Sequence, residues 1–490
     1  MILQGGVRIG LGYTCKSQYV RAAVRWSSSS PSSSFSSSSS SSVERLQVVM
    51  TDLANKIESG SSSSISQETA AYSVCELYSR LSSKQKTEFL CRMSETNKIN
   101  TDSVKVAAQN ILSAEEIGSK TQEEMISSLS PSHHQTFTKI GQIKGGVKFL
   151  VDLRRDLLHA LKSSDPISSE YTALKTMNGN LRSLLSNWFS VGFLTLQQVT
   201  WDSPCSLVEK ICDYEAVHPI VSWTDIKTRV GANRRCFVYL HPSMPGEPVV
   251  ILHVALTRGE VSSSVDALVR SHAHSWSRST EDREACRAAI FYSVTSTQAG
   301  LQGIELGTHL IKQAVTSLKS EFPAINTFST LSPIPGFRSW LFVELTKASR
   351  GEAKPLLKQE IVEVQRLFQG SNSLTLNEEI ITALKTSDWY KNEEFVNVMK
   401  PVLMRLCARY LFLEKRRNFA LNSVANFHLR NGSCLWRVNW LGDTSRRGLD
   451  YSCGMMVNYR YYLDRLEHNS NNYINNFAID ADQQVLDLVK

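Results

Sequence analysis

Residues 288–331, "AAIFYSVTSTQAGLQGIELGTHLIKQAVTSLKSEFPAINTFSTL", contain the pattern that most clearly indicates the fold class. This stretch opens with "AAIFYSVTS", a run of strand length that is rich in apolar and β-branched residues. A turn with several glycines follows and leads into a helix of about 15 residues, after which "INTFSTL" is a further strand. A strand, a glycine-bearing turn, a helix and a strand in this order predict a mixed α/β core.

Two more strand-like runs precede this core. "RRCFVYL" (234–240) and "PVVILHVALT" (248–257) are joined by "HPSMPGE", a loop with proline and glycine, and together they predict a β-hairpin. The hairpin and the core belong to one predicted domain over residues 191–490.

The region from Val43 to about Ser190 has helical periodicity instead. In "VERLQVVMTDLANKIE" (43–58) apolar residues recur every three or four positions, and similar stripes follow in "AAYSVCELYSRL" and "VKFLVDLRRDLLHALK". We therefore predict an all-helical bundle domain over residues 43–190 whose role is packing, a lid or oligomer contacts. The expected fold class is α+β, with the bundle followed by the mixed α/β domain.

The first 42 residues differ in composition from the rest. They contain four basic residues and no acid, which is half of the net charge of +8, and they end in "SSSSPSSSFSSSSSSS". This composition is typical of a mitochondrial presequence with a serine-rich linker, over residues 1–42. A plain serine tail is the alternative.

The composition of the 490 residues excludes several other classes. No apolar run reaches the length of a membrane helix, and the remaining charge forms no basic stripe with interleaved aromatics, so we expect neither membrane insertion nor nucleic-acid binding. The ten cysteines have no paired spacing and are interpreted as reduced thiols. The "HAH" at 272–274 lacks a third ligand at a usual interval, so we predict no metal site.

Ser332 follows the last strand of the core and is followed by "PIPG" (333–336). Two prolines fix the backbone and remove two amide donors, so we expect the chain to leave the sheet at Ser332. A serine side chain in this place is held rigidly. The alternative is an ordinary strand end followed by a turn.

The segment "QGIELGTHL" (302–310) lies where the predicted helix begins. Free amides at a helix N-terminus bind phosphate, and Gly303 and Gly307 allow close approach. The spacing of the glycines matches neither a P-loop nor the dinucleotide fingerprint. A weak match to the coenzyme A turn of the GNAT acyltransferases remains, with Glu305 in place of a glycine. A helix start with packing glycines is the alternative.

Several longer motifs resemble the malonyl-CoA decarboxylase family, in the same order along the chain. They are "GLQGIELGTHLIK", "TLSPIPGF", "PVLMRLCARYL", "NSVANFHLRNGSCLWRVNWLGD" and "SCGMMVNYRYYL". The resemblance runs from about residue 43 to residue 490 and is strongest from residue 229 onward. It implies an N-terminal helical domain and a GNAT-like catalytic domain, which agrees with the division above.

The resemblance also implies site residues. The catalytic serine of the family falls on Ser332 and the catalytic histidine on His428, while Tyr461 matches a tyrosine near the substrate. Without the family, a buried structural histidine is the favoured interpretation of His428. The residues implied for binding coenzyme A are Gln302, Gly303, Ile304, Glu305, Leu306, Gly307 and Thr308. Ser423 stands where relatives commonly have proline.

The implied reaction is the decarboxylation of malonyl-CoA to acetyl-CoA and carbon dioxide through a thioester enolate. Such an enzyme regulates the malonyl-CoA level and so fatty acid synthesis and oxidation. It needs no cofactor, since coenzyme A is part of the substrate, and it is expected to form a homo-oligomer, a tetramer. The rival functions are GNAT-type acyl transfer from acyl-CoA to an acceptor, and a CoA-binding scaffold without activity.

The resemblance and the N-terminal composition together predict a location in the mitochondrial matrix. Without the presequence the enzyme is expected in the cytoplasm. Many relatives end in Ser-Lys-Leu, the peroxisomal address, whereas this sequence ends in "DLVK", so its C-terminus does not support a peroxisomal location.

Overall fold

The structure is a computed structural model. It describes residues 42–59, 63–96, 101–114, 116–129, 131–270, 282–304, 306, 310–368, 375–386 and 388–490. The predicted presequence and linker therefore lie outside the described residues, except for residue 42. The prediction that no metal site is present concerned the "HAH" at 272–274, which also lies outside the described residues.

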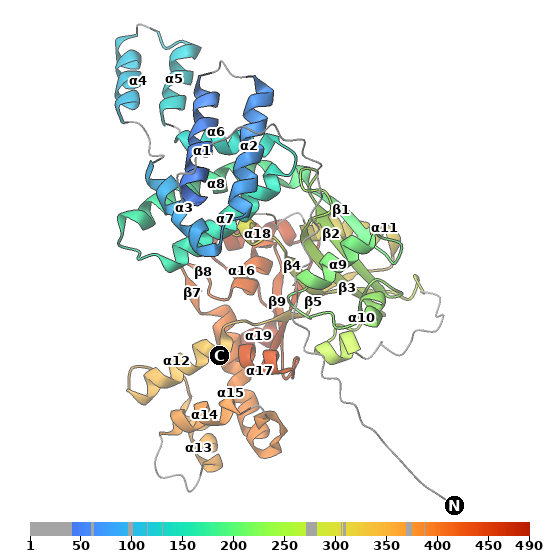
Figure 1. Ribbon diagram of the computed structural model, residues 1–490. Coiled ribbons are helices and arrows are strands. Elements are labelled where there is room, and N and C mark those ends of the chain that lie inside the picture. Colours follow the sequence, from blue (N-terminus) through green and yellow to red (C-terminus); the bar gives the residue numbers. More distant parts are fainter. Residues whose placement is uncertain are drawn as a thin grey trace, which may run out of the picture. The chain divides into compact units, whose positions relative to one another are not determined.

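Helices fill the first part of the described chain and are drawn in blue to green in Figure 1. Their bounds are α1 (Ser42–Glu58), α2 (Ser64–Ser79), α3 (Ser83–Thr96), α4 (Thr101–Ser113), α5 (Ser119–Leu129), α6 (Ser132–Gln142), α7 (Gly146–Ser163) and α8 (Ser169–Trp188). Each apolar stripe quoted from the sequence lies within or overlaps one of them. α7 shows why the stripes form helices, because its residues at intervals of three and four, such as Val147, Leu150, Leu157 and Ala160, are buried on one face.

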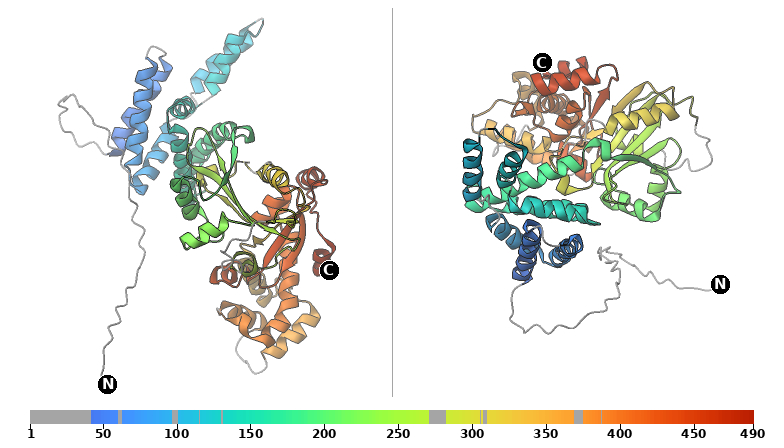
Figure 2. Two further views of the ribbon diagram at one scale, coloured as in Figure 1. Left: turned by 90° about the vertical axis from the view of Figure 1, so that its right-hand side faces the viewer. Right: turned by 90° about the horizontal axis from the view of Figure 1, so that it is seen from above.

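Strands dominate the region that follows. Their bounds are β1 (Thr195–Val199), β2 (Arg234–Leu240), β3 (Pro248–Thr257), β4 (Ala288–Ser296), β5 (Thr327–Thr330), β6 (Ser332–Pro333), β7 (Lys415–Arg416), β8 (Phe419–Ala420), β9 (Cys434–Asn439) and β10 (Met456–Tyr461). The main sheet has the order β1-β2-β3-β4-β5-β10-β6, with β9 also paired to β10. Figure 2 shows how strands drawn in green and in red, far apart in the sequence, join in this sheet.

The predicted hairpin and core strands are confirmed. β2 and β3 pair antiparallel, and β4 has the predicted bounds. The predicted fold class is confirmed as well, since a helical region precedes a mixed-sheet domain. The helix predicted after the glycine turn is present as α11 (Leu310–Glu321), with 12 described residues.

The expectation that the chain leaves the sheet at Ser332 is wrong. Val457 and Met456 of β10 pair with Ser332 and Pro333, which form β6. Proline is tolerated there because, within the described sheet, β6 has β10 as its neighbour on one side only, so no ladder needs an amide from Pro333.

The main sheet opens next to Ser332. β4 and β5 are parallel neighbours only from Ala288↔Thr327 to Phe291↔Thr330. Beyond Phe291, β4 continues beside β3 alone, whereas the chain after Thr330 continues beside β10. The two strands therefore diverge at Ser332, and the described start of the glycine turn, residues 297–304, follows the end of β4.

More helices complete the chain. They are α9 (Cys205–Tyr214), α10 (Trp223–Arg229), α12 (Phe337–Ser349), α13 (Lys358–Leu367), α14 (Leu376–Lys385), α15 (Glu393–Phe412), α16 (Ser423–Arg430), α17 (Arg446–Ser452), α18 (Leu466–Asn476) and α19 (Gln483–Val489), with short helical turns η1 (Val191–Phe193), η2 (Asp266–Arg270), η3 (Ala299–Leu301) and η4 (Trp389–Lys391). The helices α12 to α15 were not predicted as helices, although the quoted motif "PVLMRLCARYL" lies in α15. They have a separate hydrophobic core with α16, β9 and β10. No helix in the described ranges is long and apolar enough to cross a membrane.

The N-terminal helices and the sheet share one hydrophobic core. That core includes Leu150 and Val151 of α7 together with Leu252 of β3 and Phe291 of β4. The helical region is therefore packed directly on the domain that contains the predicted site.

Candidate active site

The segment after Ser332 is held from several sides. The carbonyl of Pro335 accepts hydrogen bonds from Nδ2 of Asn422 at 2.8 Å and from the hydroxyl of Tyr410 at 3.2 Å. Gly336 has a φ of 87°, in the region that favours glycine, and a Cβ there would lie 2.9 Å from the Tyr410 hydroxyl. Only 5% of Ser332 is exposed, so its hydroxyl is both buried and fixed in place.

His428 reaches this serine from α16. Asn422 caps that helix at its N-terminus and also binds the Pro335 carbonyl, so one side chain ties the helix of His428 to the segment that follows Ser332. Nε2 of His428 lies 3.2 Å from Oγ of Ser332, and both side chains are buried. Ser423 is the first residue of α16, a position that proline also suits.

Tyr461 completes the cluster from the end of β10. Its hydroxyl lies 2.7 Å from Nδ1 of His428. The ring of Tyr459, two residues earlier on the same strand, stacks on the imidazole with 4.6 Å between centroids. The structure thus brings together the three residues that the sequence suggested as catalytic, Ser332, His428 and Tyr461.

The hydrogen bonds of the cluster assign the proton on His428. The Ser332 hydroxyl donates to Oγ1 of Thr330 at 2.9 Å. Because a serine has a single hydroxyl proton, we assign Nε2 of His428 as the donor toward Ser332. Nδ1 is then the acceptor for the Tyr461 hydroxyl. With this assignment, His428 is a neutral imidazole whose proton lies on Nε2 and is directed at the serine oxygen.

Burial controls the electrostatics of the cluster. It lowers the pKa of His428 to about 3, because the charged imidazolium loses its hydration. It raises the pKa of Tyr461 well above the usual range for the same reason. The partner of Nδ1 is a neutral phenol rather than the carboxylate of a serine hydrolase triad. The arrangement therefore keeps a neutral histidine beside the serine.

Thr330 was not predicted as a site residue. It lies between the two parts of the strand that pair with β10, where the regular ladder is interrupted. Its Oγ1 accepts a hydrogen bond from the Tyr459 amide at 3.1 Å in addition to the bond from Ser332. One feature of the sequence could have indicated it. Side chains two positions apart on a strand lie on the same face, so Thr330 and Ser332 share a face.

Asn458 was missed as well. Its Nδ2 donates to the Thr330 carbonyl at 2.6 Å, and its Oδ1 accepts from Nε of Arg437 at 3.0 Å and from Nδ2 of Asn439 at 2.7 Å. This side chain is fully buried. It fixes the backbone of Thr330 and, through it, the acceptor of the Ser332 hydroxyl.

The predicted coenzyme A turn is described in part. Gln302 and Gly303 are exposed, Gly303 has a φ of 77°, and Ile304 and Leu306 are buried. The remaining predicted residues, Glu305, Gly307 and Thr308, lie outside the described residues. The turn precedes α11 as expected, and its role in binding remains a prediction.

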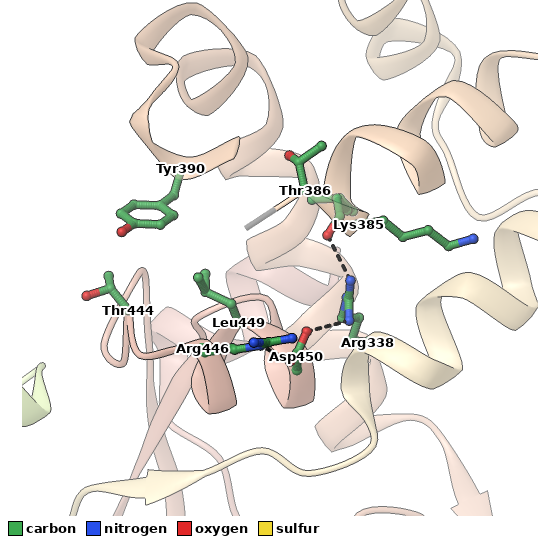
Figure 3. Close-up of a pocket in the computed structure, with 9 residues that line it drawn as sticks. Arg338, Lys385, Thr386, Tyr390, Thr444, Arg446, Leu449 and Asp450 are labelled. Atoms are coloured by element: carbon green, nitrogen blue, oxygen red, sulfur yellow. Dashed lines mark hydrogen bonds and ion pairs between the residues drawn. The ribbon is translucent and has the colours of Figure 1, made fainter. Parts of the chain in front are cut away.

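A charged pocket lies elsewhere, between α12, α14 and α17 (Figure 3). Arg338 donates to Asp450 at 3.0 Å and to the Leu384 carbonyl at 3.0 Å, while Arg446 lies on the other side of the Asp450 carboxylate. None of the residues predicted for catalysis lines it. The Arg338–Asp450 pair connects the helix that follows Ser332 to the helix that precedes β10.

Family comparisons match both parts of the chain. The family model of the malonyl-CoA decarboxylase C-terminal domain matches residues 192–490, and that of the N-terminal domain matches residues 98–189. Two curated proteins, both called "Malonyl-CoA decarboxylase, mitochondrial", align over 363 residues, or 74% of this chain. The protein from Anser anser anser is 47% identical with 70% of its length covered, and that from Mus musculus is 46% identical with 72% covered.

Solved structures agree with these matches. The malonyl-CoA decarboxylase from Rhodopseudomonas palustris has a TM-score of 0.77 at 28% identity, covering 91% of this chain and 99% of its own. That from Agrobacterium vitis has a TM-score of 0.72, also at 28% identity, covering 90% and 100%. The fold, the site and these likenesses define a carbon–carbon lyase of the decarboxylase class. More narrowly, this chain belongs to the malonyl-CoA decarboxylase family.

Proposed function

We propose that this chain converts malonyl-CoA to acetyl-CoA and carbon dioxide through a thioester enolate, with Ser332 and His428 acting on the malonyl group. The observation that carries the proposal is the buried contact of 3.2 Å between Ser332 Oγ and His428 Nε2, in a chain of this family. Its activity lowers the malonyl-CoA level and so affects fatty acid synthesis and oxidation.

Ser332 orients the malonyl carboxylate. Decarboxylation breaks the bond between the α-carbon and the carboxylate, and the electron pair moves onto the α-carbon and the thioester oxygen. The carboxylate must leave its hydration behind and lie out of the thioester plane for this to happen. A hydroxyl held by Thr330 and by the clamped segment after it can turn its proton to that carboxylate at a small energetic cost.

His428 supplies the proton that ends the reaction. In the free protein its low pKa keeps it neutral, and a neutral imidazole is a weak acid. The malonyl carboxylate brings a negative charge into the buried cluster, which raises the pKa of His428, so a proton from solvent is taken up with the substrate. The imidazolium then protonates the enolate carbon, and the proton count of the reaction is balanced.

Tyr461 is suited to both states of His428. A tyrosine hydroxyl can donate to Nδ1 of the neutral ring and accept from Nδ1–H of the charged ring. The high pKa of Tyr461 keeps its proton in place in both cases. We assign it the role of orienting the imidazole next to the substrate.

The turn after β4 is proposed to bind coenzyme A. Gln302 to Thr308 lead into α11, whose N-terminus offers amides to the pyrophosphate. The divergence of β4 from the strand of Ser332 leaves the turn and the serine on the two sides of one opening. A pantetheine chain entering that opening runs from the turn to the serine.

No cofactor is proposed. The thioester itself accepts the electron pair that decarboxylation leaves, which is the task of a metal, biotin or thiamine in other decarboxylations. Within the described residues no cluster of histidine, cysteine and acidic side chains is arranged to hold a metal ion.

We further propose the organisation that the sequence predicts. Residues 1–42 act as a presequence that directs the chain to the mitochondrial matrix, residues 43–190 form a helical domain that assembles a tetramer, and residues 191–490 form the catalytic domain. The curated relatives are named mitochondrial, which supports the address. Imaging of residues 1–42 fused to a fluorescent protein tests the address, and sedimentation of the purified enzyme tests the tetramer.

Incubation of the purified chain with malonyl-CoA tests the activity. Acetyl-CoA should form together with carbon dioxide in the absence of any acceptor. An acyltransferase would form product only when an amine is added, and a scaffold would leave malonyl-CoA unchanged after prolonged incubation. Either of those results would overturn the proposal.

A further inference from the structure

The turn that precedes the proposed phosphate contacts is pressed against the N-terminal helical region. A Cβ at Gly300 would lie 1.8 Å from the carbonyl oxygen of Val151 in α7, so no side chain fits at this position. This close contact at Gly300 places the backbone of residues 299–302 directly against α7. The helical region is thus part of the surroundings of the turn.

Arg154 of α7 donates to this turn. One terminal nitrogen of its guanidinium binds the carbonyl of Gly300, and the other binds the carbonyl of Gln302 at 2.9 Å. Nε binds Oδ1 of Asn178 in α8 at 3.1 Å. A single side chain of the helical region therefore holds two carbonyl groups of the turn, those of residues 300 and 302.

The guanidinium carries a charge that its partners do not neutralise. Only 2% of Arg154 is exposed, and the three acceptors just named are all neutral oxygens. Burial and the nearby Arg182 lower the pKa of Arg154 to about 10, which leaves it protonated at neutral pH. A buried cation without a counter-charge is unfavourable, and a bound anion nearby relieves this.

The hydrogen bond from Arg154 to the Gln302 carbonyl sets the direction of the next amide, that of Gly303. The C=O and N–H of a trans peptide point in opposite directions, so the Gly303 amide faces away from Arg154. Gly303 is exposed, and its φ of 77° is one that favours glycine. That amide is directed away from the helical region, toward the solvent side of the turn.

We propose that Arg154 is a positioning residue for the binding of coenzyme A. Its guanidinium orients the turn from the side that faces α7, and the phosphates of the bound nucleotide balance its charge. This inference rests on the proposed function of the turn. It assigns the helical region a part in binding the pyrophosphate, a diphosphate ester carrying two or more negative charges. The effect appears in substrate binding and not in the chemistry at Ser332.

A comparison of two substrates tests the inference. Malonyl-pantetheine carries the same reacting group as malonyl-CoA but lacks the nucleotide and its phosphates. Arg154→Gln should raise the KM for malonyl-CoA about tenfold or more, because a charge-assisted interaction is lost, with kcat within about threefold of wild type. Its kcat/KM for malonyl-pantetheine should fall far less. Arg154→Lys keeps the charge and should recover part of the loss, while Lys162→Met, an exposed change on α7, is the matched control.

Different failures have different meanings. Equal losses on both substrates would show that Arg154 only supports the fold, which overturns the inference. A wild type with the same kcat/KM for both substrates would show that the phosphates are not bound, so the proposed turn itself would be wrong while decarboxylation stands. Should the variants not fold, hydrogen exchange of the wild type decides: CoA should slow exchange in peptides covering α7 and residues 298–304, and no protection of α7 contradicts the role of Arg154.

Discussion

Oγ of Ser332 lies 3.2 Å from Nε2 of His428, although the two residues are 96 positions apart in the chain. The contact is possible because β6 pairs with β10 and because Asn422 fastens α16 to the carbonyl of Pro335. Both side chains are almost completely buried, so the histidine stays neutral until a negative charge arrives. In the proposed mechanism, a malonyl carboxylate supplies such a charge at the place where the proton is needed.

Tyr461→Phe removes the hydroxyl that faces Nδ1 of His428. The imidazole then loses its partner in both protonation states, and we expect kcat to fall about 10- to 100-fold with the KM for malonyl-CoA changed much less. Steady-state kinetics measure kcat and KM separately. Tyr462→Phe, a change at the neighbouring and more exposed tyrosine, is the control and should keep wild-type kcat. A Tyr461→Phe enzyme with unchanged kcat would contradict the assigned role.

Thr330→Val keeps the shape of the side chain but removes the acceptor of the Ser332 hydroxyl. That hydroxyl then turns to Nε2 of His428 and favours the other tautomer, so we expect kcat to fall about tenfold or more. The Tyr459 amide also loses its acceptor, which should lower the free energy of unfolding by about 1–3 kcal/mol. Thr330→Ser restores the acceptor and should rescue most of kcat. If valine and serine variants lose kcat equally, the oxygen at this position has no role in catalysis.

Local patterns in the sequence predicted the local parts of the fold. The hairpin β2–β3, strand β4 and the helix over the stripe of α7 follow from apolar spacing, which is a property of neighbouring residues. The pairing of β10 with both β5 and β6 joins segments more than a hundred residues apart, and no local pattern specifies it. For that reason Thr330 looked like an ordinary strand residue.

The site was predictable only in part for the same reason. The motifs around Ser332, His428 and Tyr461 resemble a known family, so those residues were identified, and the structure brings them together. Asn458 and Arg154 act through contacts between distant segments. Their sequence surroundings, a strand and an amphipathic helix, carry no sign of those contacts.

His428 should make stability depend on pH. Its pKa is about 3 in the folded chain and near 6.5 when unfolded, so the unfolded state binds the extra proton between these values. This contribution to stability is fully present above pH 6.5 and is lost as the pH falls toward 3. From pH 7 to pH 5 the loss is about 2 kcal/mol.

Urea unfolding at pH 7 and pH 5 measures that loss. Other groups titrate in the same range, so the comparison is with His428→Gln, which cannot take up the proton. The difference between the two pH values should be smaller in the variant by about 2 kcal/mol. An equal pH dependence in both proteins would show that His428 is not a neutral buried histidine.

Removal of metal ions should leave the enzyme active. The proposed chemistry uses the thioester to accept electrons and His428 to supply the proton. Dialysis against EDTA, followed by assay in metal-free buffer, should retain at least about four-fifths of kcat, since no step depends on a Lewis acid. A loss of activity that zinc or magnesium restores would contradict the proposed mechanism.

The joint role of Ser332 and His428 is tested by the rate of acetyl-CoA formation from malonyl-CoA by four proteins: wild type, Ser332→Ala, His428→Asn and the double variant. If serine and histidine act in one step, each single variant loses about 10² to 10⁴ in kcat, and the double variant is little worse than the poorer single. All should bind CoA with near-normal affinity. A His428→Asn enzyme with near-wild-type kcat, or a double variant whose loss is the product of the two single losses, would contradict the claim that these residues act together on the malonyl group.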